Sequence, residues 1–251
     1  MKQIIFFSFL LLLMNFVKAQ NLKVEYDRII KEDLNGSLPA ESSDVFKNKV
    51  IEELKKPTKE ILYVLDGNTF YKSIPRTSIT HEEESKKVDE HTTIRPKTEY
   101  KDIQTKIYHI KGDKGFYQYF SFHGDEYYYN YIPKFSKIEY KDDTEYIEKY
   151  KCKLAELTSD SGVLTKVWYT EDIPVSAGPY AYGNLPGLVL KIESPEYIVY
   201  ATKVSNEAKK EDFENLNPKI KVLNEEEFFK KMGEFIEESK KVKKTENNIH
   251  L

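Results

Sequence analysis

The chain has 251 residues, of which 39% are hydrophobic, 32% charged and 14% aromatic. Lysine and arginine number 39 and aspartate and glutamate 42, which gives a formal charge of −3 at pH 7. This near balance excludes a strongly basic nucleic-acid-binding protein, and the composition is neither collagen-like nor rich in disulfides. The 19 tyrosines and 14 phenylalanines bury a large area per residue, so they supply a core to a chain of low hydrophobic content.

Residues 1–19 have the features of a signal peptide. Lys2 provides a positive charge, an apolar run extends from Ile4 to Val17, and Ala19 ends the segment with the small side chain that signal peptidase accepts. We therefore expect cleavage after Ala19 and export to the periplasm or the extracellular space. The apolar run is shorter than the roughly 20 residues of a spanning helix, so we expect no membrane-spanning segment in the mature chain. No cysteine follows the run, so we do not expect a lipoprotein.

The single cysteine, Cys152, has no partner for an intramolecular disulfide. It lies in a stretch where polar and apolar residues alternate, which predicts a small buried hydrophobic residue. The alternative is a reactive nucleophile.

The N-terminal third predicts a strand, a helix and a hairpin. Polar and apolar residues alternate over 22–26, which is typical of a strand with one buried face. Residues 43–56 have a helical spacing of apolar residues, with Ser43 as the cap. Two β-rich runs, 61–65 and 69–74, flank an Asp-Gly-Asn turn and predict a hairpin.

Residues 76–99 are polar and densely charged, and we expect them to form a long exposed loop. His81 and His91 lie there among acidic residues, which raises the question of a metal site. Their spacing fits no standard ligand pattern, so we predict no bound metal.

From residue 105 onwards, short β-rich runs are separated by turn residues. The predicted strands cover residues 105–111, 116–122, 127–132, 136–140, 152–157, 163–169, 188–193 and 197–204. Tyr117 and Tyr119 share one face of their strand, opposite to its phenylalanines. A strand with aromatic residues on both faces is covered on both sides or presents a binding surface, so these two tyrosines are candidate ligand contacts.

The tail predicts a helix over about 225–244. Phe228, Met232 and Phe235 form an apolar stripe, and Asn224 with Glu227 resembles a capping box. We expect this helix to pack on the sheet, with partner binding as the alternative.

The predicted strands are joined mainly by turns rather than by helices, which favours a mainly β fold. The sequence predicts a single, strongly curved antiparallel sheet, bowl-like or a partly open barrel, with one helix near the N-terminus and one at the C-terminus. No domain boundary is evident, so we expect one β-rich domain over residues 20–251.

The loop 170–187 has three prolines and three glycines in 18 residues. Loops longer than about 12–15 residues are uncommon in compact domains and are often functional. Pro186 and Gly187 suit a type II turn with a positive φ at the glycine. Tyr180 and Tyr182 are the best candidates for ligand contact. We expect the loop to act first as an architectural clasp at the end of the sheet, formed by Trp168 (facing the core), Pro174, Gly178, Pro179, Leu185, Pro186 and Gly187, with ligand binding as its other role.

Four segments in and next to this loop together resemble the signature of the GLPGLI family, exported proteins of Gram-negative bacteria. They are Val167-Trp-Tyr-Thr170, Ile173-Pro174, Gly178-Pro179-Tyr180 and Asn184-Leu-Pro-Gly-Leu-Val189. Asn184 and Val189 replace a glycine and an isoleucine of the namesake hexapeptide, and both are mild replacements because asparagine tolerates a left-handed backbone and valine suits a strand. The resemblance extends over the mature chain. It implies no established activity and no catalytic residues. A related domain that precedes some bacterial N-glycan-cleaving enzymes as a bowl-like β module implies a binding or accessory role.

Motifs for catalysis are not evident: the sequence has no Gly-x-Ser-x-Gly elbow, His-Glu-x-x-His helix, phosphate loop or dinucleotide-binding glycine pattern. We therefore predict no catalytic residues and no cofactor. The main interpretation is an exported binding or accessory module of the cell envelope that holds a hydrophobic ligand, a peptide or an envelope protein. The alternative is a hydrolase that acts on glycans or peptides through an unrecognised site. A deep apolar concavity would favour binding, and converging acidic or histidine groups would favour an enzyme.

Overall fold

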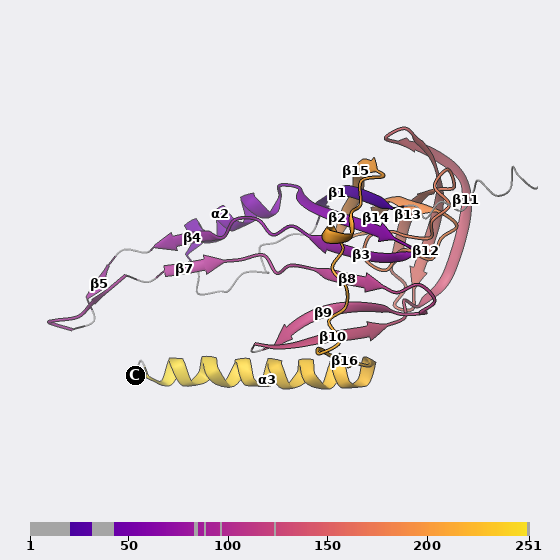
Figure 1. Ribbon diagram of the computed structural model, residues 1–251. Coiled ribbons are helices and arrows are strands. Elements are labelled where there is room, and N and C mark those ends of the chain that lie inside the picture. Colours follow the sequence, from indigo (N-terminus) through magenta and orange to yellow (C-terminus); the bar gives the residue numbers. More distant parts are fainter. Residues whose placement is uncertain are drawn as a thin grey trace, which may run out of the picture.

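A computed structural model describes residues 21–31, 43–82, 85–87, 89–95, 97–122 and 124–249. The signal peptide expected over 1–19 lies outside these residues. Twelve strands form one sheet in the order β11-β12-β13-β14-β15-β1-β2-β3-β8-β9-β10-β16 (Figure 1). Their bounds are β1 Leu22–Ile30, β2 Thr58–Leu65, β3 Asn68–Ser73, β8 Lys106–His109, β9 Phe116–Phe122, β10 Asp125–Tyr131, β11 Phe135–Ile147, β12 Tyr150–Ser159, β13 Leu164–Thr170, β14 Leu188–Glu193, β15 Tyr197–Ser205 and β16 Lys221–Leu223.

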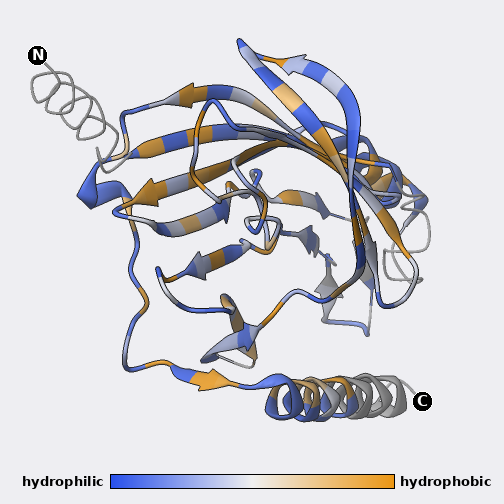
Figure 2. Cartoon of the chain, turned by 90° about the vertical axis from the view of Figure 1, so that its right-hand side faces the viewer, coloured by the Kyte–Doolittle hydropathy of each residue, from blue (hydrophilic) through white to orange (hydrophobic). Residues whose placement is uncertain are grey.

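The sheet is strongly curved and stays open, because its edge strands β11 and β16 do not pair with each other (Figure 2). The predicted β-rich fold with one curved sheet is therefore confirmed. One pairing departs from the antiparallel prediction: β10 and β16 run parallel. The reason is that the chain reaches β16 through a long segment that crosses the sheet, and not through a hairpin turn.

The inner face of the sheet is the side on which the loop 170–187 packs. Ile173, Ala177, Ala181 and Leu185 of this loop are buried in one cluster with residues of the central strands. The hydroxyl of Tyr26 on β1 donates a 2.7 Å hydrogen bond to the carbonyl of Val189 beneath the loop. The loop is thus a packed part of the core.

The outer face is crossed by residues 206–220, which we call the strap and which Figure 1 shows in orange between β15 and β16. Phe213 of the strap packs against Phe70 and Tyr108 of the sheet. The hydroxyl of Tyr108 donates a 2.7 Å hydrogen bond to Glu214 of the strap. The strap thus covers aromatic residues on the outer face of the sheet.

Helix α3, Glu225–Ile249, follows the strap and packs on the sheet beside β10 (Figure 1). Its capping box is present: Glu227 N–H donates to Asn224 Oδ1 at 3.0 Å, and Asn224 N–H donates to Glu227 Oε2 at 3.1 Å. Phe228 is buried against Phe120 and Tyr129, so the predicted packing on the sheet is confirmed. Among the described residues, no helix has the length and apolar character needed to cross a membrane.

Helix α2, Asp44–Leu54, begins at Ser43, whose hydroxyl accepts a hydrogen bond from Phe46 N–H at 3.3 Å as the sequence predicted. Residues 76–99 are not simply a loop, which corrects that expectation. Their described part forms two short antiparallel pairs, β4 Ile79–Glu82 with β7 Lys97–Tyr100, and β5 Lys86–Lys87 with β6 Thr93–Ile94. These strands form an arm that projects from the sheet (Figure 1). The sequence pattern did not predict this arm, because an exposed hairpin needs no alternation of polar and apolar residues.

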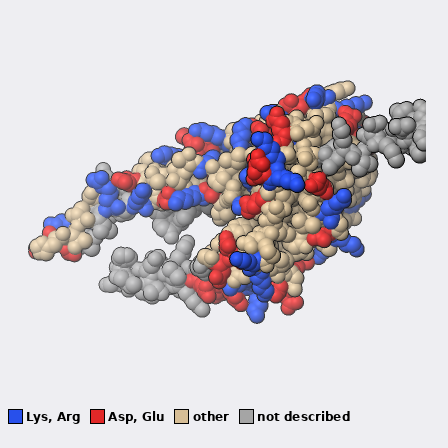
Figure 3. Space-filling view, viewed as in Figure 1, with Lys and Arg blue, Asp and Glu red and all other residues tan. Residues whose placement is uncertain are grey.

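Several other predicted elements match the structure. The strands predicted over 116–122 and 188–193 are β9 and β14. The hairpin turn has positive φ at Asp66 (52°) and Gly67 (86°), as a two-residue turn between strands requires. β11 is longer than predicted, because residues 141–146 at the sheet edge are half-buried or exposed and show no alternation of buried and exposed residues. On the face shown in Figure 3, basic and acidic side chains are interspersed and do not form a patch of one sign.

Candidate functional site

The loop 170–187 is anchored by backbone contacts. Leu188 N–H donates to Ile173 O at 3.2 Å, and Val189 N–H donates to Ala177 O at 2.9 Å. A Cβ on Gly178 would lie 2.7 Å from the Cβ of Val189, so only glycine allows the loop to pack this closely on β14. The backbone of the loop is therefore held against the start of β14.

Gly187 is required for a different reason than predicted. Its φ is 158°, not the value near +80° of a type II turn, and its N–H donates to Leu185 O at 2.8 Å across Pro186. This is a three-residue turn centred on Pro186. A Cβ on Gly187 would lie 2.1 Å from the carbonyl oxygen of Thr170. Glycine is needed because the backbone of β13 is in the way. Among the three prolines of the loop, only Pro179 is buried, and Pro174 and Pro186 are exposed.

Trp168 does not face the core as expected. It is half-buried and lies on the same face of β13 as the exposed Lys166, with the ammonium of Lys191 5.8 Å from its ring centroid. Val167 and Tyr169 point inward instead. The expectation rested on Leu164 sharing the side of Trp168, and Leu164 is itself exposed near the end of the sheet.

The four candidate tyrosines do not form one site. Tyr117 and Tyr119 lie on the outer face, where their hydroxyls donate to Asp113 and Glu126. Tyr180 and Tyr182 pack on the inner face, half-buried, and Tyr182 OH lies 3.5 Å from Thr165 Oγ1. The sheet separates the two pairs.

Tyr180 belongs to a buried polar cluster that the sequence did not predict. Its hydroxyl donates a 3.2 Å hydrogen bond to Oε1 of Glu60, a residue of β2 that is only 1% exposed. Tyr71 OH donates to the other carboxylate oxygen, and Arg28 Nε lies 3.0 Å from Oε1. Burial raises the pKa of Glu60, while Tyr71 and Arg28 favour its charged form. This group of Glu60, Tyr71, Tyr180 and Arg28 is called the Glu60 cluster below.

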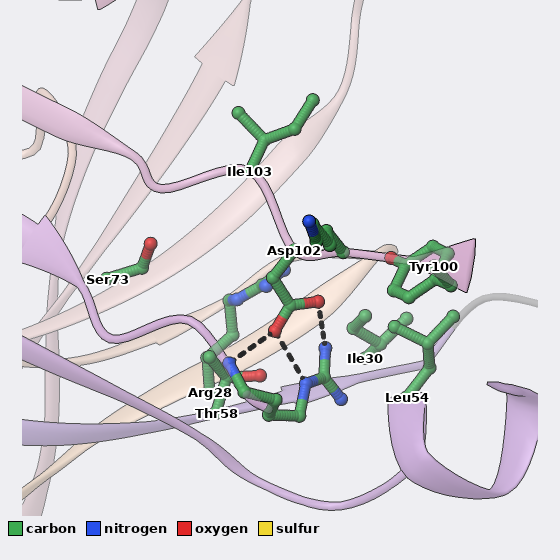
Figure 4. A pocket seen from close by; sticks show the side chains of 10 residues that line it. Arg28, Ile30, Leu54, Thr58, Ser73, Tyr100, Asp102 and Ile103 are labelled. Atoms are coloured by element: carbon green, nitrogen blue, oxygen red, sulfur yellow. Dashed lines mark hydrogen bonds and ion pairs between the residues drawn. The ribbon is translucent and has the colours of Figure 1, made fainter. Parts of the chain in front are cut away.

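Beside the Glu60 cluster, the inner face opens into a cleft of about 340 Å³. Figure 4 shows its side chains, which come from β1, α2, β2, β3, β7 and the segments that follow β3 and β7. The lining residues are Arg28, Ile30, Leu54, Thr58, Ser73, Arg76, Tyr100, Lys101, Asp102 and Ile103.

An ion pair forms one wall of the cleft. Arg76 donates from Nε and Nη2 to the two carboxylate oxygens of Asp102, at 2.8 and 3.0 Å, and its backbone N–H adds a third bond at 2.9 Å. Although burial raises the pKa of Asp102, these bonds outweigh it and hold the pKa below its usual value. Asp102 is thus an engaged, ionised group and a poor proton donor.

Arg28 and Thr58 provide the unengaged groups of the cleft. They face each other across the β1–β2 pair. Thr58 is 3% exposed, and its Oγ1 has no hydrogen-bond partner. The Nε atom of Arg28, which lies 3.0 Å from Glu60 Oε1 in the ion pair, is buried and has no partner with hydrogen-bond geometry. Buried polar atoms without partners are rare in folded proteins and call for an explanation.

The cleft lacks the groups of a recognisable catalytic centre. Within the described part of the chain, no three His, Cys, Asp or Glu residues come together to hold a metal ion. Glu60 and Asp102 are the acidic groups in and beside the cleft, and the oxygens of both are already bonded. Cys152 is fully buried, as predicted. The arrangement favours binding over acid–base chemistry.

The inner face offers little room for a hydrophobic ligand where the loop meets β11 and β12. The apolar hollow between Phe135, Leu157 and Leu185 has a volume of about 10 Å³, room for one water molecule at most.

Only one signal in the sequence pointed to the cleft. Thr58 and Glu60 occupy the inward positions of a strand whose next inward residues are Leu62 and Val64. A polar residue at a core-facing position of a strand is unusual and needs a partner. Asp102 and Arg76 had no such signal, because they lie outside regular strands.

Comparison with known proteins links part of the chain to a glycanase module. Residues 126–227 match the model of the N-glycanase peptide, N-terminal domain. A solved structure described as PNGF-II in a C2 space group is 15% identical, with a TM-score of 0.47, and the match covers 82% of this chain and 31% of that one. PNGF-II in a P21 space group is 16% identical, with a TM-score of 0.49 and coverages of 85% and 33%.

The chain spans about a third of the length of these PNGF-II structures. No curated protein matches. The matched segment extends from β10 to the start of α3 and includes the clasp loop, whereas the residues of the cleft precede it. Residues 126–227 are therefore similar to an N-glycanase N-terminal domain.

Proposed function

We propose that the mature chain is an exported, non-catalytic binding module of the cell envelope, which takes part of a carbohydrate chain into the cleft beside Arg28. The observation that carries this proposal is the cleft itself. It places hydrogen-bonding groups next to the aromatic ring of Tyr100 and the aliphatic side chains of Ile30 and Leu54. A sugar ring presents hydroxyl groups at its rim and C–H groups on its faces, so it needs this mixture. The likeness of residues 126–227 to an N-glycanase N-terminal domain supports a glycan as the ligand.

The size of the cleft is consistent with a small ligand group. Ligand pockets usually measure about 300–1,000 Å³, and 340 Å³ lies at the lower end of that range. The cleft therefore suits a terminal sugar or a short segment.

Export and family membership are parts of the same proposal. The segment 1–19 supports export with Gln20 as the mature N-terminus. The motif segments between Val167 and Val189 support membership of the GLPGLI family. Intact-mass measurement of the protein from its host tests the first point, and retention of residues 1–19 would contradict it.

Binding is tested on a glycan array with the fluorescently labelled chain 20–251. We expect a set of glycans to bind the parent and to lose most of the signal with Arg28→Gln. Arg95→Gln is the matched control, because Arg95 lies in the arm and its side chain is 63% exposed. Thermal melts of both variants verify that they are folded. If no glycan binds the parent, or if both variants bind like the parent, the proposal is wrong.

The hydrolase alternative has a separate test. Because Asp102 and Glu60 are both engaged, we expect no release of glycan from a denatured glycoprotein incubated with the chain. Release that disappears with Asp102→Asn would overturn the non-catalytic role.

A further inference from the structure

A groove of about 580 Å³ lies between helix α2 and the chain that enters the arm, and we call it the α2–β4 groove. Lys49 and Glu53 of α2 form one wall, and residues 75–80 form the other. Beside the groove, His81 of β4 stacks on Phe46 of α2 with ring centroids 6.2 Å apart, so helix and strand hold a fixed distance. Of the lining residues, Arg76 alone also lines the carbohydrate cleft, so the two cavities are neighbours with different walls.

Strand β4 presents an unpaired edge to this groove. It pairs with β7 on one side, and within the described residues no strand pairs with its other side. Lys49 Nζ donates a 3.3 Å hydrogen bond to the carbonyl oxygen of Thr80, so this carbonyl points away from β7. Successive residues of an antiparallel pair alternate in the side to which their backbone groups point. Ser78 and Thr80 therefore both face the open edge, and the N–H of Thr80 has no partner among the described residues.

An open strand edge beside a helix is suited to an extended peptide. The backbone groups of Ser78 and Thr80 repeat every second residue, and another extended chain has donors and acceptors at the same spacing. The wall formed by α2 gives the side chains of such a chain a surface to contact. The exposed side chain of Lys49 covers the edge carbonyl, which is a common protection of an edge, but it is long enough to turn aside.

The charges of the groove favour an acidic peptide. Glu53 is paired with Lys56, and Arg76 with Asp102. Lys49 has no carboxylate partner among the described residues, so its charge is uncompensated. Val45, one turn before Lys49 on the same side of α2, is 66% exposed and offers an apolar contact.

We propose that the α2–β4 groove binds an extended, acidic segment of a partner protein, which adds a strand to the open edge of β4. The backbone of the segment bonds to Ser78 and Thr80. A carboxylate side chain bonds to Lys49, and an apolar side chain next to it on the same face contacts Val45. This interaction is separate from carbohydrate binding in the cleft.

The experiment begins with a phage library of random octapeptides, selected on the immobilised chain 20–251. We expect the selected peptides to be enriched in acidic and β-branched residues. One selected peptide is then synthesised with a methyl group on one backbone nitrogen at a time and titrated calorimetrically. An added strand directs every second N–H to β4, so methylation should lower the affinity at least tenfold at alternate positions and less than twofold between them.

Variants of the chain locate the peptide. Thr80→Pro removes the N–H at the open edge and leaves the β7 pairing intact, and it should lower the affinity at least tenfold. Glu99→Pro is the matched control: Glu99 is the partner of Thr80 in β7, and its N–H faces the opposite edge. Lys49→Gln should lower the affinity at least threefold, and Lys55→Gln, on the same helix but outside the groove, should not change it. Thermal melts verify that the variants are folded.

The methylation series uses the parent chain alone, so it decides the question even if a proline variant fails to fold. If no selected peptide binds the parent in solution, or if methylation shows no two-residue period, the inference is wrong. Equal binding to the parent and to folded Thr80→Pro would also overturn it. Selected peptides without acidic residues would contradict the role of Lys49. The glycan array tests the proposed function separately from all of these results.

Discussion

The hydroxyl of Tyr180 donates a 3.2 Å hydrogen bond to Oε1 of Glu60, which lies 120 residues earlier in the chain. Glu60 belongs to the central strand β2 and Tyr180 to the clasp loop, so the bond joins the loop to the sheet beside the cleft. Tyr180 has a φ of 53°, a left-handed conformation that bulky residues rarely adopt. Such a conformation persists where the surroundings hold it, and here the ring packs 5.0 Å from that of Tyr71.

Tyr180→Phe should therefore lower the free energy of unfolding by about 1–2 kcal/mol, because it removes a hydrogen bond to a buried carboxylate and keeps the ring. Tyr182→Phe is the control, since the groups beside its hydroxyl, Thr165 Oγ1 at 3.5 Å and the hydroxyl of Tyr197, are neutral. Urea denaturation of both variants measures the difference. Equal decreases in the free energy of unfolding of the two variants would show that the hydrogen bond to Glu60 contributes no more than the contacts of the Tyr182 hydroxyl.

Glu60 should make stability depend on pH. Burial raises its pKa above the usual 4.5, so over a range above 4.5 the folded chain keeps a proton that the unfolded chain has lost. The folded state binds more protons there, and its free energy of unfolding must fall as the pH rises through that range. Glu60→Gln removes this dependence. The stability of the parent relative to the variant should thus be greatest below pH 4.5 and decrease above it, as measured by urea denaturation across that pH. A difference that is constant or grows with pH would contradict the raised pKa.

Gly187→Ala should be strongly destabilising. The new Cβ would lie 2.1 Å from the carbonyl oxygen of Thr170, so the backbone of β13 or the loop must move. We expect a loss of about 3 kcal/mol or more, in the range of severe steric substitutions. Gly162→Ala is the matched control: its φ is +84° but nothing lies within 4 Å of its Cβ position, so only the conformational cost of about 1–2 kcal/mol applies. Equal decreases in the melting temperature of the two variants would show that the close contact between Gly187 and Thr170 does not matter for stability.

The docking of α3 should depend on one of two adjacent phenylalanines. Phe228 is 6% exposed, with its ring centroid 4.2 Å from that of Tyr129, whereas Phe229 is 60% exposed. Phe228→Ala should cost about 3 kcal/mol of docking free energy and Phe229→Ala about 0.5 kcal/mol or less. Hydrogen exchange of the helix amides measures docking directly. Exchange that increases equally in both variants would mean that the helix is not held by Phe228.

Cys152 should be unreactive in the folded chain. The side chain is fully buried, and burial raises the pKa of its thiol to about 11, so little thiolate is present near neutral pH. A thiol-specific reagent such as DTNB should modify it only after denaturation. Rapid modification of the folded protein would show that the cysteine is accessible.

Local features of the fold were evident in the sequence. The Ser43 cap, the Asn224–Glu227 capping box and the two-residue turn at Asp66 each depend on groups a few residues apart. The strands β9 and β14 were found with the correct bounds, because their residues have strong β propensity and turns flank them. The mainly antiparallel sheet also followed, from the many short strands joined by turns.

The site depended on contacts that the sequence pattern does not contain. A period of two residues indicates that a strand has two faces, but it does not say which loop fills the inner one. Tyr180 was therefore assigned to a ligand while its real partner is Glu60, and Trp168 was placed on the wrong face. The arm and the strap were missed for the same reason, since an exposed hairpin and an irregular segment carry no periodic signal.

The sequence by itself determined those elements of this protein that depend on residues close together in the chain, namely the helix caps, the turns and the strands with alternating residues. Only the tertiary structure decided that Arg28, Thr58 and Glu60 face inward at or beside a cleft, and that Tyr180, 120 residues further along the chain, bonds to Glu60. The physical reason is that a buried charge is tolerated only where several distant groups satisfy it together. That arrangement is a property of the packed sheet, and no single stretch of the chain contains it.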